Sequence, residues 1–327
     1  MPLLDVRGKG PGALVEMAPD RAAALVAQGR RSYGGLALRI GDRATWRWLV
    51  RTGNPYRDDI AAVAERLSTP GAFLLNLSYE WTCTSGVGPD PCGAGNRMLR
   101  TLDWPLRGLG GNVVVAHQDG GSGTYYNVTW PGFVGAYTAM APSRFSAAIN
   151  QPPMKAFTRS CWFDWAISRT GMWRTSGLPP AHLLRQAFDE CATYDDARRL
   201  LSEAPICAPA FFTLSGADED AGCIIERTED GAEIHETPAS IANHWIKFDL
   251  PGRARGADSE GRRDLMESLR DRAPDDFSWL TPPILNPTTR LAVIANAKRG
   301  SLMAQGWEAD GPATRVFNLG EHLYAGR

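Results

Sequence analysis

The sequence has no run of about 18 uncharged apolar residues, the length that a transmembrane helix requires, so it predicts no membrane-spanning helix. It also lacks the charged start and apolar stretch of a secretory signal, which leads us to expect a cytoplasmic protein. Its six cysteines show no Cys-x-x-Cys spacing, and its five histidines form no i, i+4 pair, which disfavours a zinc site. A disulfide framework is equally disfavoured in so long a chain without an export signal.

A surplus of charge is also missing. Lys and Arg number 35 against 36 Asp and Glu, and the formal net charge of −1 offers no electrostatic argument for binding nucleic acid or an anionic membrane. Neither a Gly-x-Ser-x-Gly motif nor a Gly-x-x-x-x-Gly-Lys loop occurs, which argues against an α/β-hydrolase and against a nucleotide-binding protein. We therefore expect no metal and no cofactor.

What the sequence does contain is Cys83, followed by Thr-Ser at the end of an apolar run, and then Arg100-Thr-Leu-Asp103. A thiol with an ordinary pKa of about 8.5 is mostly protonated at neutral pH, so a nucleophilic cysteine needs a base. A cysteine at a chain's own N-terminus carries that base, because its α-amine has a pKa of about 7.7–8.0. Individually these residues are commonplace, since free cysteines are mostly buried hydrophobes and Arg-x-x-Asp is often a surface ion pair.

Together with the preceding run Phe-Leu-Leu-Asn-Leu-Ser-Tyr-Glu (73–80), these residues resemble the cleavage junction of the N-terminal-nucleophile cysteine amidases of the acid ceramidase, N-acylethanolamine acid amidase and choloylglycine hydrolase type. The resemblance implies self-cleavage between Thr82 and Cys83. Residues 1–82 would then be a pro-region or small subunit, released or retained, and residues 83–327 the catalytic domain. It also implies an α+β fold of four αββα layers, in which two stacked antiparallel sheets are flanked by helices.

In such an enzyme Cys83 would be the nucleophile, Arg100 would favour its thiolate, and Asp103 would orient the new α-ammonium. A bend or bulge in the strand would bring the side chains of Arg100 and Asp103 to one pocket. The resemblance further implies that Asn150 and Asn243 donate hydrogen bonds to the oxyanion.

A later arginine completes the implied set, and the sequence offers Arg262 or its neighbour Arg263. Either could instead be an exposed charge at the start of a helix. The chain departs from the family pattern after Asn243, where His244-Trp245 stands in place of an aromatic-acidic pair.

The segment 157–178 is rich in large aromatic residues, namely Phe157, Trp162, Phe163, Trp165 and Trp173. We expect a loop there that forms an apolar wall for an acyl chain, with Trp162, Phe163 and Trp165 as substrate-binding residues. Burial of these rings in the core is the alternative.

The remaining pattern supports the α+β class, because strands and helices come in runs and do not alternate. Helices are predicted over 20–29, 58–68 and 259–271 and twice within 181–203, with a capping box at Thr193. Strands are predicted over 73–79, 112–117, 124–129, 133–140, 145–150, 210–214, 223–227 and 232–236, with a hairpin over 291–297 and 301–307.

The resulting functional expectation is a self-processing amidase that hydrolyses a linear C–N amide bond in a small N-acyl compound, one with a lipophilic acyl group. Its cleaved N-terminal segment would be its own partner. Two alternatives remain open at this stage. One is an acyltransferase that passes the acyl group to an amine, and the other is a non-catalytic binding protein on the same fold.

Overall fold

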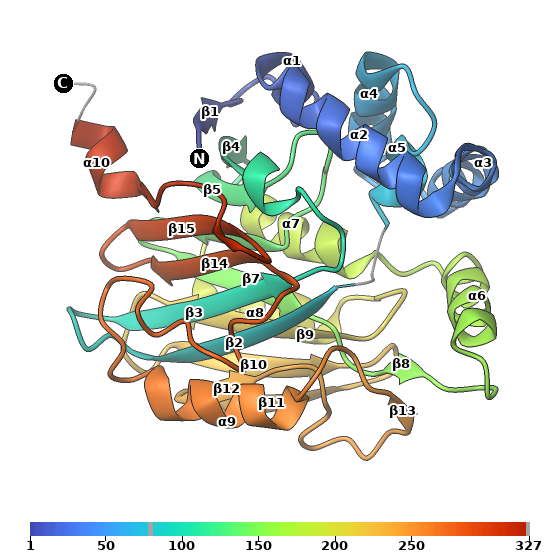
Figure 1. The fold of residues 1–327 in the computed structure, drawn as a ribbon. Helices are drawn as coiled ribbons and strands as arrows, with labels where there is room; N and C mark the ends of the chain where they lie inside the picture. Colours follow the sequence, from blue (N-terminus) through green and yellow to red (C-terminus); the bar gives the residue numbers. More distant parts are fainter. Residues whose placement is uncertain (78–80, 325–327) are drawn as a thin grey trace.

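The computed structural model describes residues 1–77 and 81–324 of the chain. Two stacked sheets form its centre (Figure 1). The first has eight strands in the order β1 (Leu3–Asp5), β4 (Val114–Gly120), β5 (Gly123–Thr129), β6 (Thr138–Ala141), β7 (Phe145–Asn150), β9 (Ala210–Gly216), β10 (Gly222–Arg227) and β11 (Ala232–Glu236). All of its pairs are antiparallel except β1 with β4.

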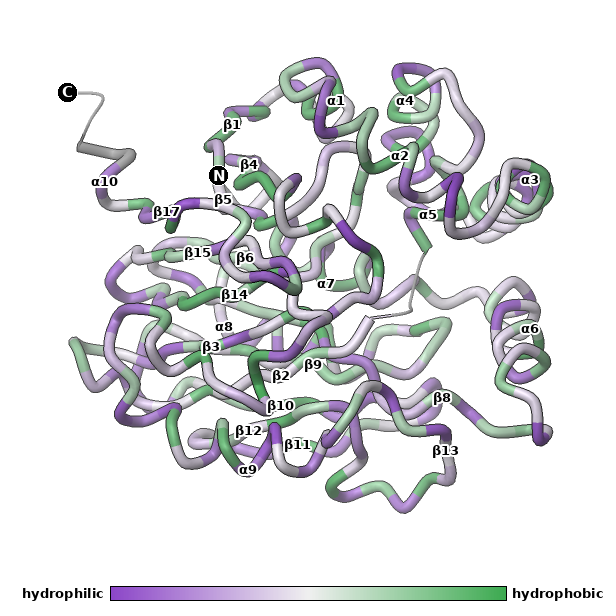
Figure 2. Tube along the Cα trace, viewed as in Figure 1, coloured by the Kyte–Doolittle hydropathy of each residue, from purple (hydrophilic) through white to green (hydrophobic). Residues whose placement is uncertain are grey.

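The second sheet has seven strands. Their order is β12 (Ala239–Ile241), β2 (Thr82–Pro89), β3 (Asn96–Asp103), β14 (Thr289–Asn296), β15 (Ser301–Glu308) and β16 (Gly311–Pro312), with β17 (Phe317–Asn318) also paired to β15. The inner faces of the two sheets share one large apolar core, which contains Cys83, Leu102 and Val293 from the second sheet and Tyr126 and Ala147 from the first. Figure 2 shows apolar residues along strands of both sheets, such as β4 of the first and β14 of the second.

Helices cover the outer face of each sheet. α7 (Pro180–Glu190) and α8 (Tyr194–Glu203) pack on the first sheet, and α9 (Ser259–Leu269) packs on β2 and β12 of the second. The expected four-layer arrangement is thereby confirmed.

The N-terminal segment forms a helical lobe with its own small core. Its helices are α1 (Ala13–Met17), α2 (Pro19–Tyr33), α3 (Gly35–Thr52), α4 (Arg57–Leu67) and α5 (Ala72–Leu75). Trp48, Ile60 and Ala72 of this lobe pack against Val134 and Met172 of the body. The lobe is therefore attached to the body by apolar contacts as well as by the covalent chain.

Two sequence-based expectations are wrong, one at residues 73–79 and one at residues 157–178, and one helix of the N-terminal segment was missed. The predicted strand 73–79 is wrong because residues 72–75 form α5, while residues 78–80 lie outside the described part of the chain. α3 was not predicted. The segment 157–178, expected to be a loop, contains the helix α6 (Cys161–Met172). This helix follows the short strand β8 (Met154–Lys155), which pairs with β13 (Gly252–Arg253).

The short remaining elements are a 3₁₀ turn, η1 (Gly110–Asn112), and the terminal helix α10 (Leu319–Tyr324). Among the described residues, no helix has both the length and the apolar character needed to cross a membrane.

Candidate active site

Cys83 lies near the start of β2, in the interior of the molecule, and is fully buried. It pairs with Leu102 of β3, and Ser85 pairs with Arg100. Because side chains alternate along a strand, Cys83, Ser85, Arg100 and Leu102 all face the space between the two sheets. Cys83 and Leu102 accordingly belong to the core shared by the two sheets.

Arg100 contacts the thiol directly. Its Nη2 donates a hydrogen bond to Cys83 Sγ at 3.4 Å and another to the carbonyl of Ile149 at 3.0 Å. Its Nε and Nη1 are buried without a hydrogen-bond partner. A buried guanidinium with unused donors is costly unless an acceptor arrives. Arg100 therefore offers the space beside the sulfur both a positive charge and free N–H groups.

Burial raises the pKa of the Cys83 thiol to about 12, and the negative charge of Asp103 adds to the rise, whereas Arg100 and Arg262 oppose it. The thiol of the intact chain is therefore protonated at neutral pH. Burial also raises the pKa of Asp103, against the opposing effect of Arg262.

Asp103 lies on the other face of the sheet from Arg100. The pairing of β2 with β3 runs without interruption, so no bulge brings the two side chains to the same side, and that expectation is wrong. The Asp103 carboxylate accepts hydrogen bonds from Thr289 Oγ1 at 2.9 Å and from Asn286 Nδ2 at 3.1 Å. Arg262 Nη1 lies 3.8 Å from Asp103 Oδ2.

Arg262 connects the elements around Cys83. Its Nη1 donates to the backbone carbonyl of Cys83 at 2.8 Å and to Thr84 Oγ1 at 3.0 Å, and its Nη2 donates to Asn243 Oδ1 at 3.0 Å. Arg262 is almost fully buried, whereas the side chain of Arg263 is one-third exposed and bonds the carbonyl of Ser240. The structure thus places Arg262, and not Arg263, against the nucleophile.

The position of Arg262 depends on how closely α9 approaches β2. The helix begins after Asp258, whose carboxylate accepts a hydrogen bond from the N–H of Gly261 at 3.0 Å. A Cβ on Gly86 of β2 would lie 2.8 Å from Met266 Cγ of α9, so only glycine allows this approach. The first turn of α9 therefore reaches the backbone of Cys83.

The two predicted oxyanion donors both lie close to Cys83. Asn243 Oδ1 accepts a hydrogen bond from the backbone N–H of Cys83 at 3.0 Å, and its Nδ2 donates to the carbonyl of Gln151 at 2.7 Å. Asn150 accepts from Ser85 Oγ at 2.7 Å and donates to the carbonyl of Ala242 at 3.1 Å. Since an amide NH₂ has two hydrogens, Asn243 keeps a second one for a further acceptor.

The expected substrate-binding aromatic residues are not gathered around Cys83. Trp162 and Phe163 are 77% and 67% exposed on α6, and neither lines the two cavities described next. Trp165 does line a cavity, together with Phe157 and Gln151, the residue that follows Asn150.

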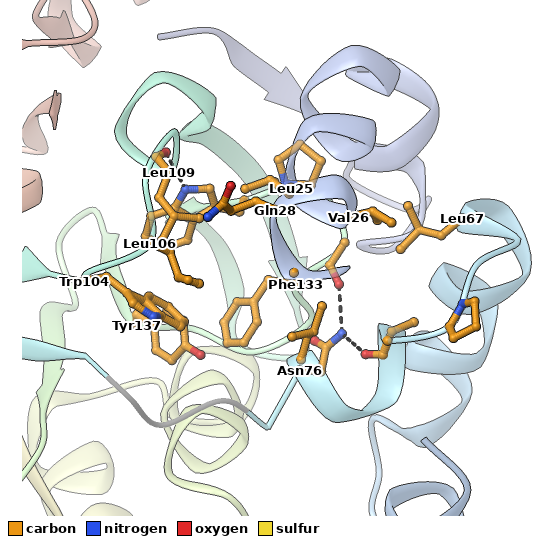
Figure 3. Close-up of a pocket in the computed structure, with 18 residues that line it drawn as sticks. Leu25, Val26, Gln28, Leu67, Asn76, Trp104, Leu106, Leu109, Phe133 and Tyr137 are labelled. Atoms are coloured by element: carbon orange, nitrogen blue, oxygen red, sulfur yellow. Dashed lines mark hydrogen bonds between the residues drawn. The ribbon is translucent and has the colours of Figure 1, made fainter. Parts of the chain in front are cut away.

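A different apolar cavity lies between the N-terminal lobe and the body (Figure 3). The body contributes Trp104, Leu106, Leu109, Trp130, Phe133 and Tyr137, and the lobe contributes Leu25, Val26, Leu67 and Leu75. Trp81, two residues before Cys83, packs against Tyr137 and Trp104 with ring centroids 4.4 Å and 5.5 Å apart. This cavity therefore begins beside the segment that leads to the nucleophile.

Sequence reasoning missed several residues of the site. Ser85 orients Asn150, whereas Thr289 and Asn286 orient Asp103. Thr289 and Asn286 lie far along the chain from Asp103, and no local motif marks them. Trp104 had a usable signal, since it directly follows the Arg-x-x-Asp motif.

One group of described side chains could offer three ligand atoms to a metal ion, namely Asp90, Cys92 and Asp275. Its two carboxylates already form ion pairs with Arg97 and Arg299. A cation would have to displace these arginines, so the donor set does not favour a metal.

Comparisons with known proteins show similarity to amide-hydrolysing enzymes. The chain is 26% identical over 215 residues to a probable acid ceramidase of Caenorhabditis elegans, a match that covers 59% of this chain and 52% of that protein. It is 26% identical over 185 residues to an N-acylethanolamine-hydrolyzing acid amidase of Oryctolagus cuniculus, covering 54% and 49%. The resemblance to the acid ceramidase type of cysteine amidase is confirmed.

Two further comparisons show how much of the chain the resemblance covers. An acid ceramidase of Heterocephalus glaber is 23% identical over 296 residues, covering 81% of this chain and 73% of the relative. The solved structure of a Caenorhabditis elegans ortholog of N-acylethanolamine-hydrolyzing acid amidase has a TM-score of 0.53 at 16% identity, covering 72% of this chain and 99% of the other, which shows a shared fold. The chain spans about half the length of the first two amidase relatives. No family profile matches it.

Proposed function

We propose that this chain is a self-processing cysteine amidase that hydrolyses a linear amide bond in an N-acyl compound with an apolar acyl group. One observation carries the proposal. A buried cysteine in a chain similar to amide-hydrolysing enzymes contacts Arg100 through its sulfur, Arg262 through its carbonyl and Asn243 through its N–H.

Maturation would use these same contacts. Asn243 and Arg262 hold the peptide unit on either side of the Cys83 Cα, so the strand cannot shift while the thiol reacts. Cys83 Sγ attacks the carbonyl carbon of Thr82, the C–N bond to Cys83 breaks, and the nitrogen leaves as an amine that carries the thiol proton. Water then hydrolyses the Thr82 thioester, which gives a carboxylate on residue 82 and a free thiol on Cys83.

The new α-amine would then act as the base in catalysis. It remains next to Asn243 Oδ1 and takes the thiol proton as Sγ attacks the substrate carbonyl. The unpartnered N–H groups of Arg100 and the second hydrogen of Asn243 are the donors available to developing negative charge. The amine of the substrate departs with the proton, and water releases the acid from the thioester.

The apolar acyl group is proposed from the cavity in Figure 3. Apart from Gln28 and Asn76, its lining side chains are apolar or aromatic, and it lies beside Trp81. An acyl group attached to Cys83 takes the place of the Thr82 acyl group, so it would extend along the path of the segment before Cys83. The described residues on either side of 78–80 support this, because Leu75 and Asn76 line the cavity and Trp81 packs against Tyr137, which also lines it.

The intact mass of the purified protein tests maturation without a substrate. We expect two polypeptides, one that ends at Thr82 and one that begins at Cys83. Their masses should sum to the mass of the precursor plus one water. The Cys83→Ala variant should keep the full mass. A wild-type protein that stays full length at every pH from 4 to 9 would contradict self-processing.

A matched pair of arginine variants tests the role of the site geometry. Arg262→Lys keeps the charge but loses the planar fork that bonds three groups at once, so cleavage should slow by about 10²-fold. Arg263→Lys, one residue away and partly exposed, should cleave at the wild-type rate. An amine added to the subsequent amidase assay identifies an acyltransferase if the N-acyl amine, and not the free acid, accumulates.

A further inference from the structure

Asn243 lies beyond the end of the strand pairing that positions its neighbours. The pairing of β12 with β2 ends where Ile241 faces Ser85, two residues short of Asn243 and Cys83. The backbone N–H of Asn243 instead donates to Ser259 Oγ at 2.8 Å. Ser259 is the first residue of α9, the helix that packs on β2 and β12 (Figure 1). A side chain of α9 therefore takes over where the strand pairing stops.

The hydroxyl of Ser259 is not needed to cap α9. The Asp258 carboxylate caps the helix by accepting the N–H of Gly261 at 3.0 Å. A serine hydroxyl has one hydrogen and two acceptor lone pairs, and the bond from Asn243 uses only one of the lone pairs. The hydroxyl hydrogen of Ser259 is therefore available for a second partner.

That partner is His244, whose Nδ1 lies 2.8 Å from Ser259 Oγ. Burial lowers the pKa of His244, helped by the charge of Arg263 and opposed by three carboxylates, those of Glu260, Asp264 and Glu226. The imidazole is therefore neutral at neutral pH. With its hydrogen on Nε2, the neutral ring accepts the hydroxyl hydrogen of Ser259 at Nδ1, which turns the oxygen of Ser259 towards the N–H of Asn243.

The loop that carries His244 is anchored independently of α9. The next residue, Trp245, packs edge-on against Phe211 of β9 with ring centroids 4.9 Å apart. The fully buried carboxylate of Glu226 on β10 accepts the N–H of Ile246 at 2.8 Å. The imidazole of His244 is thus attached to a backbone segment fixed on the first sheet, so it can set the direction of the Ser259 hydroxyl.

The first turn of α9 holds Asn243 at two points. Ser259 and Arg262 are three residues apart, so their side chains lie on the same face of the helix. Ser259 accepts the backbone N–H of Asn243, while Arg262 Nη2 donates to its Oδ1. A single bond at Oδ1 would leave the backbone of Asn243 free to move, whereas bonds at both ends of the residue fix the direction of its side-chain NH₂.

We propose that Ser259 and His244 are positioning residues for the amidase reaction, which hold Asn243 where it contacts Cys83 and offers a hydrogen to the oxyanion. The inference rests on the proposed function and adds to it two residues that act through Asn243. His244 stands where this chain departs from the family pattern, so the contact with Ser259 is a feature of this chain.

Steady-state kinetics of the matured enzyme test the proposal, with N-lauroyl para-nitroanilide as the probe. Complete loss of an oxyanion donor costs about 10²–10³-fold in rate, so loosening Asn243 in Ser259→Ala or His244→Ala should lower kcat by about tenfold. KM should stay within about twofold, because neither side chain lines the cavity of Figure 3. Unchanged kcat in both variants overturns the proposal.

Ser268→Ala is the matched control for these variants. Its hydroxyl lies on the same helix but donates to the carbonyl of Leu265, away from Asn243. It should keep the wild-type kcat and KM. A loss of kcat in Ser268→Ala as large as that in Ser259→Ala would overturn the proposal, since the effect would then belong to α9 as a whole.

Conservative replacements separate positioning from a general structural role. Ser259→Thr keeps the hydroxyl, and His244→Asn places a carboxamide oxygen near the position of Nδ1, so each should keep most of the wild-type kcat. The double variant Ser259→Ala/His244→Ala should be no slower than Ser259→Ala, because both residues act through one hydroxyl. Conservative variants as slow as the alanine variants, or effects that multiply in the double variant, overturn the proposal.

Hydrogen exchange measured by mass spectrometry follows Asn243 without any activity. In the uncleaved Cys83→Ala protein, adding Ser259→Ala or His244→Ala should speed exchange of the Asn243 N–H by about tenfold, because its acceptor is lost or loosened. Unchanged exchange in both overturns the proposal. A wild type that neither cleaves itself nor hydrolyses the anilide would instead contradict the proposed function, and the exchange rate would still decide whether Ser259 and His244 hold Asn243.

Discussion

At the scale of single residues, two arginines contact Cys83 in different ways. Arg100 faces the sulfur between the sheets, whereas Arg262 approaches from the opposite face and holds the backbone. The sequence identified both residue types but could not choose between Arg262 and Arg263, because adjacent residues on a helix point about 100° apart and only packing decides which one is inward. It also could not show that Asp103 faces away from Arg100, since that follows from the register of β2 with β3.

Opposite shifts of the Cys83 pKa test this arrangement. Removing the positive charge in Arg100→Gln destabilises the thiolate, so the thiol pKa should rise. Asp103 raises the thiol pKa by its negative charge, so Asp103→Asn should lower it. The measurement is the pH dependence of iodoacetamide labelling at Cys83, read by peptide mass spectrometry, with circular dichroism as the control for folding. Shifts in the same direction would contradict the geometry.

At the scale of helices and strands, local sequence patterns predicted elements well where neighbouring residues alone determine the backbone conformation. Helices at 20–29 and 58–68 exist as α2 and α4, and Thr193 Oγ1 accepts the N–H of Asp196 as its capping motif predicts. α5 was mistaken for a strand because a short apolar run has no diagnostic period. The first turn of α5 is stabilised by a neighbouring helix, because the Asp42 carboxylate of α3 accepts hydrogen bonds from the N–H groups of Gly71 and Leu74.

The close contact of α9 with β2 leads to a prediction at this scale. In Gly86→Ala the new Cβ would meet Met266 at 2.8 Å, so α9 must move outward and carry Arg262 away from Cys83. Overpacking of this kind costs about 1–3 kcal/mol. We expect a lower melting temperature and slower cleavage at Cys83.

The double variant Gly86→Ala/Met266→Ala is the control, because it restores space at the contact. It should recover much of the cleavage rate even though Met266→Ala alone is destabilising. A double variant that cleaves no faster than Gly86→Ala would show that α9 does not position Arg262 through this contact.

At the scale of the whole molecule, the sequence could not predict the apolar cavity at the junction between the N-terminal lobe and the body, because that cavity is formed by tertiary packing. The expectation that residues 157–178 form the acyl wall came from their aromatic content, but burial depends on the tertiary packing of α6, which leaves Trp162 and Phe163 exposed. Likewise, a net charge of −1 conceals a basic stretch at residues 20–52, which contain seven arginines and two aspartates. Sums over a chain do not report where charges and apolar groups lie on its surface.

The apolar cavity of Figure 3 predicts how kcat/KM depends on the length of the acyl chain. Each buried methylene contributes about 0.8 kcal/mol, or roughly fourfold in kcat/KM, until the cavity is full. A series of N-acyl amides of one amine, from acetyl to palmitoyl, should therefore rise steeply and then level off. Val26→Phe fills the cavity from the lobe side and should move the plateau to shorter chains while sparing the acetyl substrate. Trp162→Ser, whose ring lies outside the cavity, should leave the profile for water-soluble substrates unchanged. A flat profile in the wild type, or one altered by Trp162→Ser and not by Val26→Phe, would place the acyl group elsewhere.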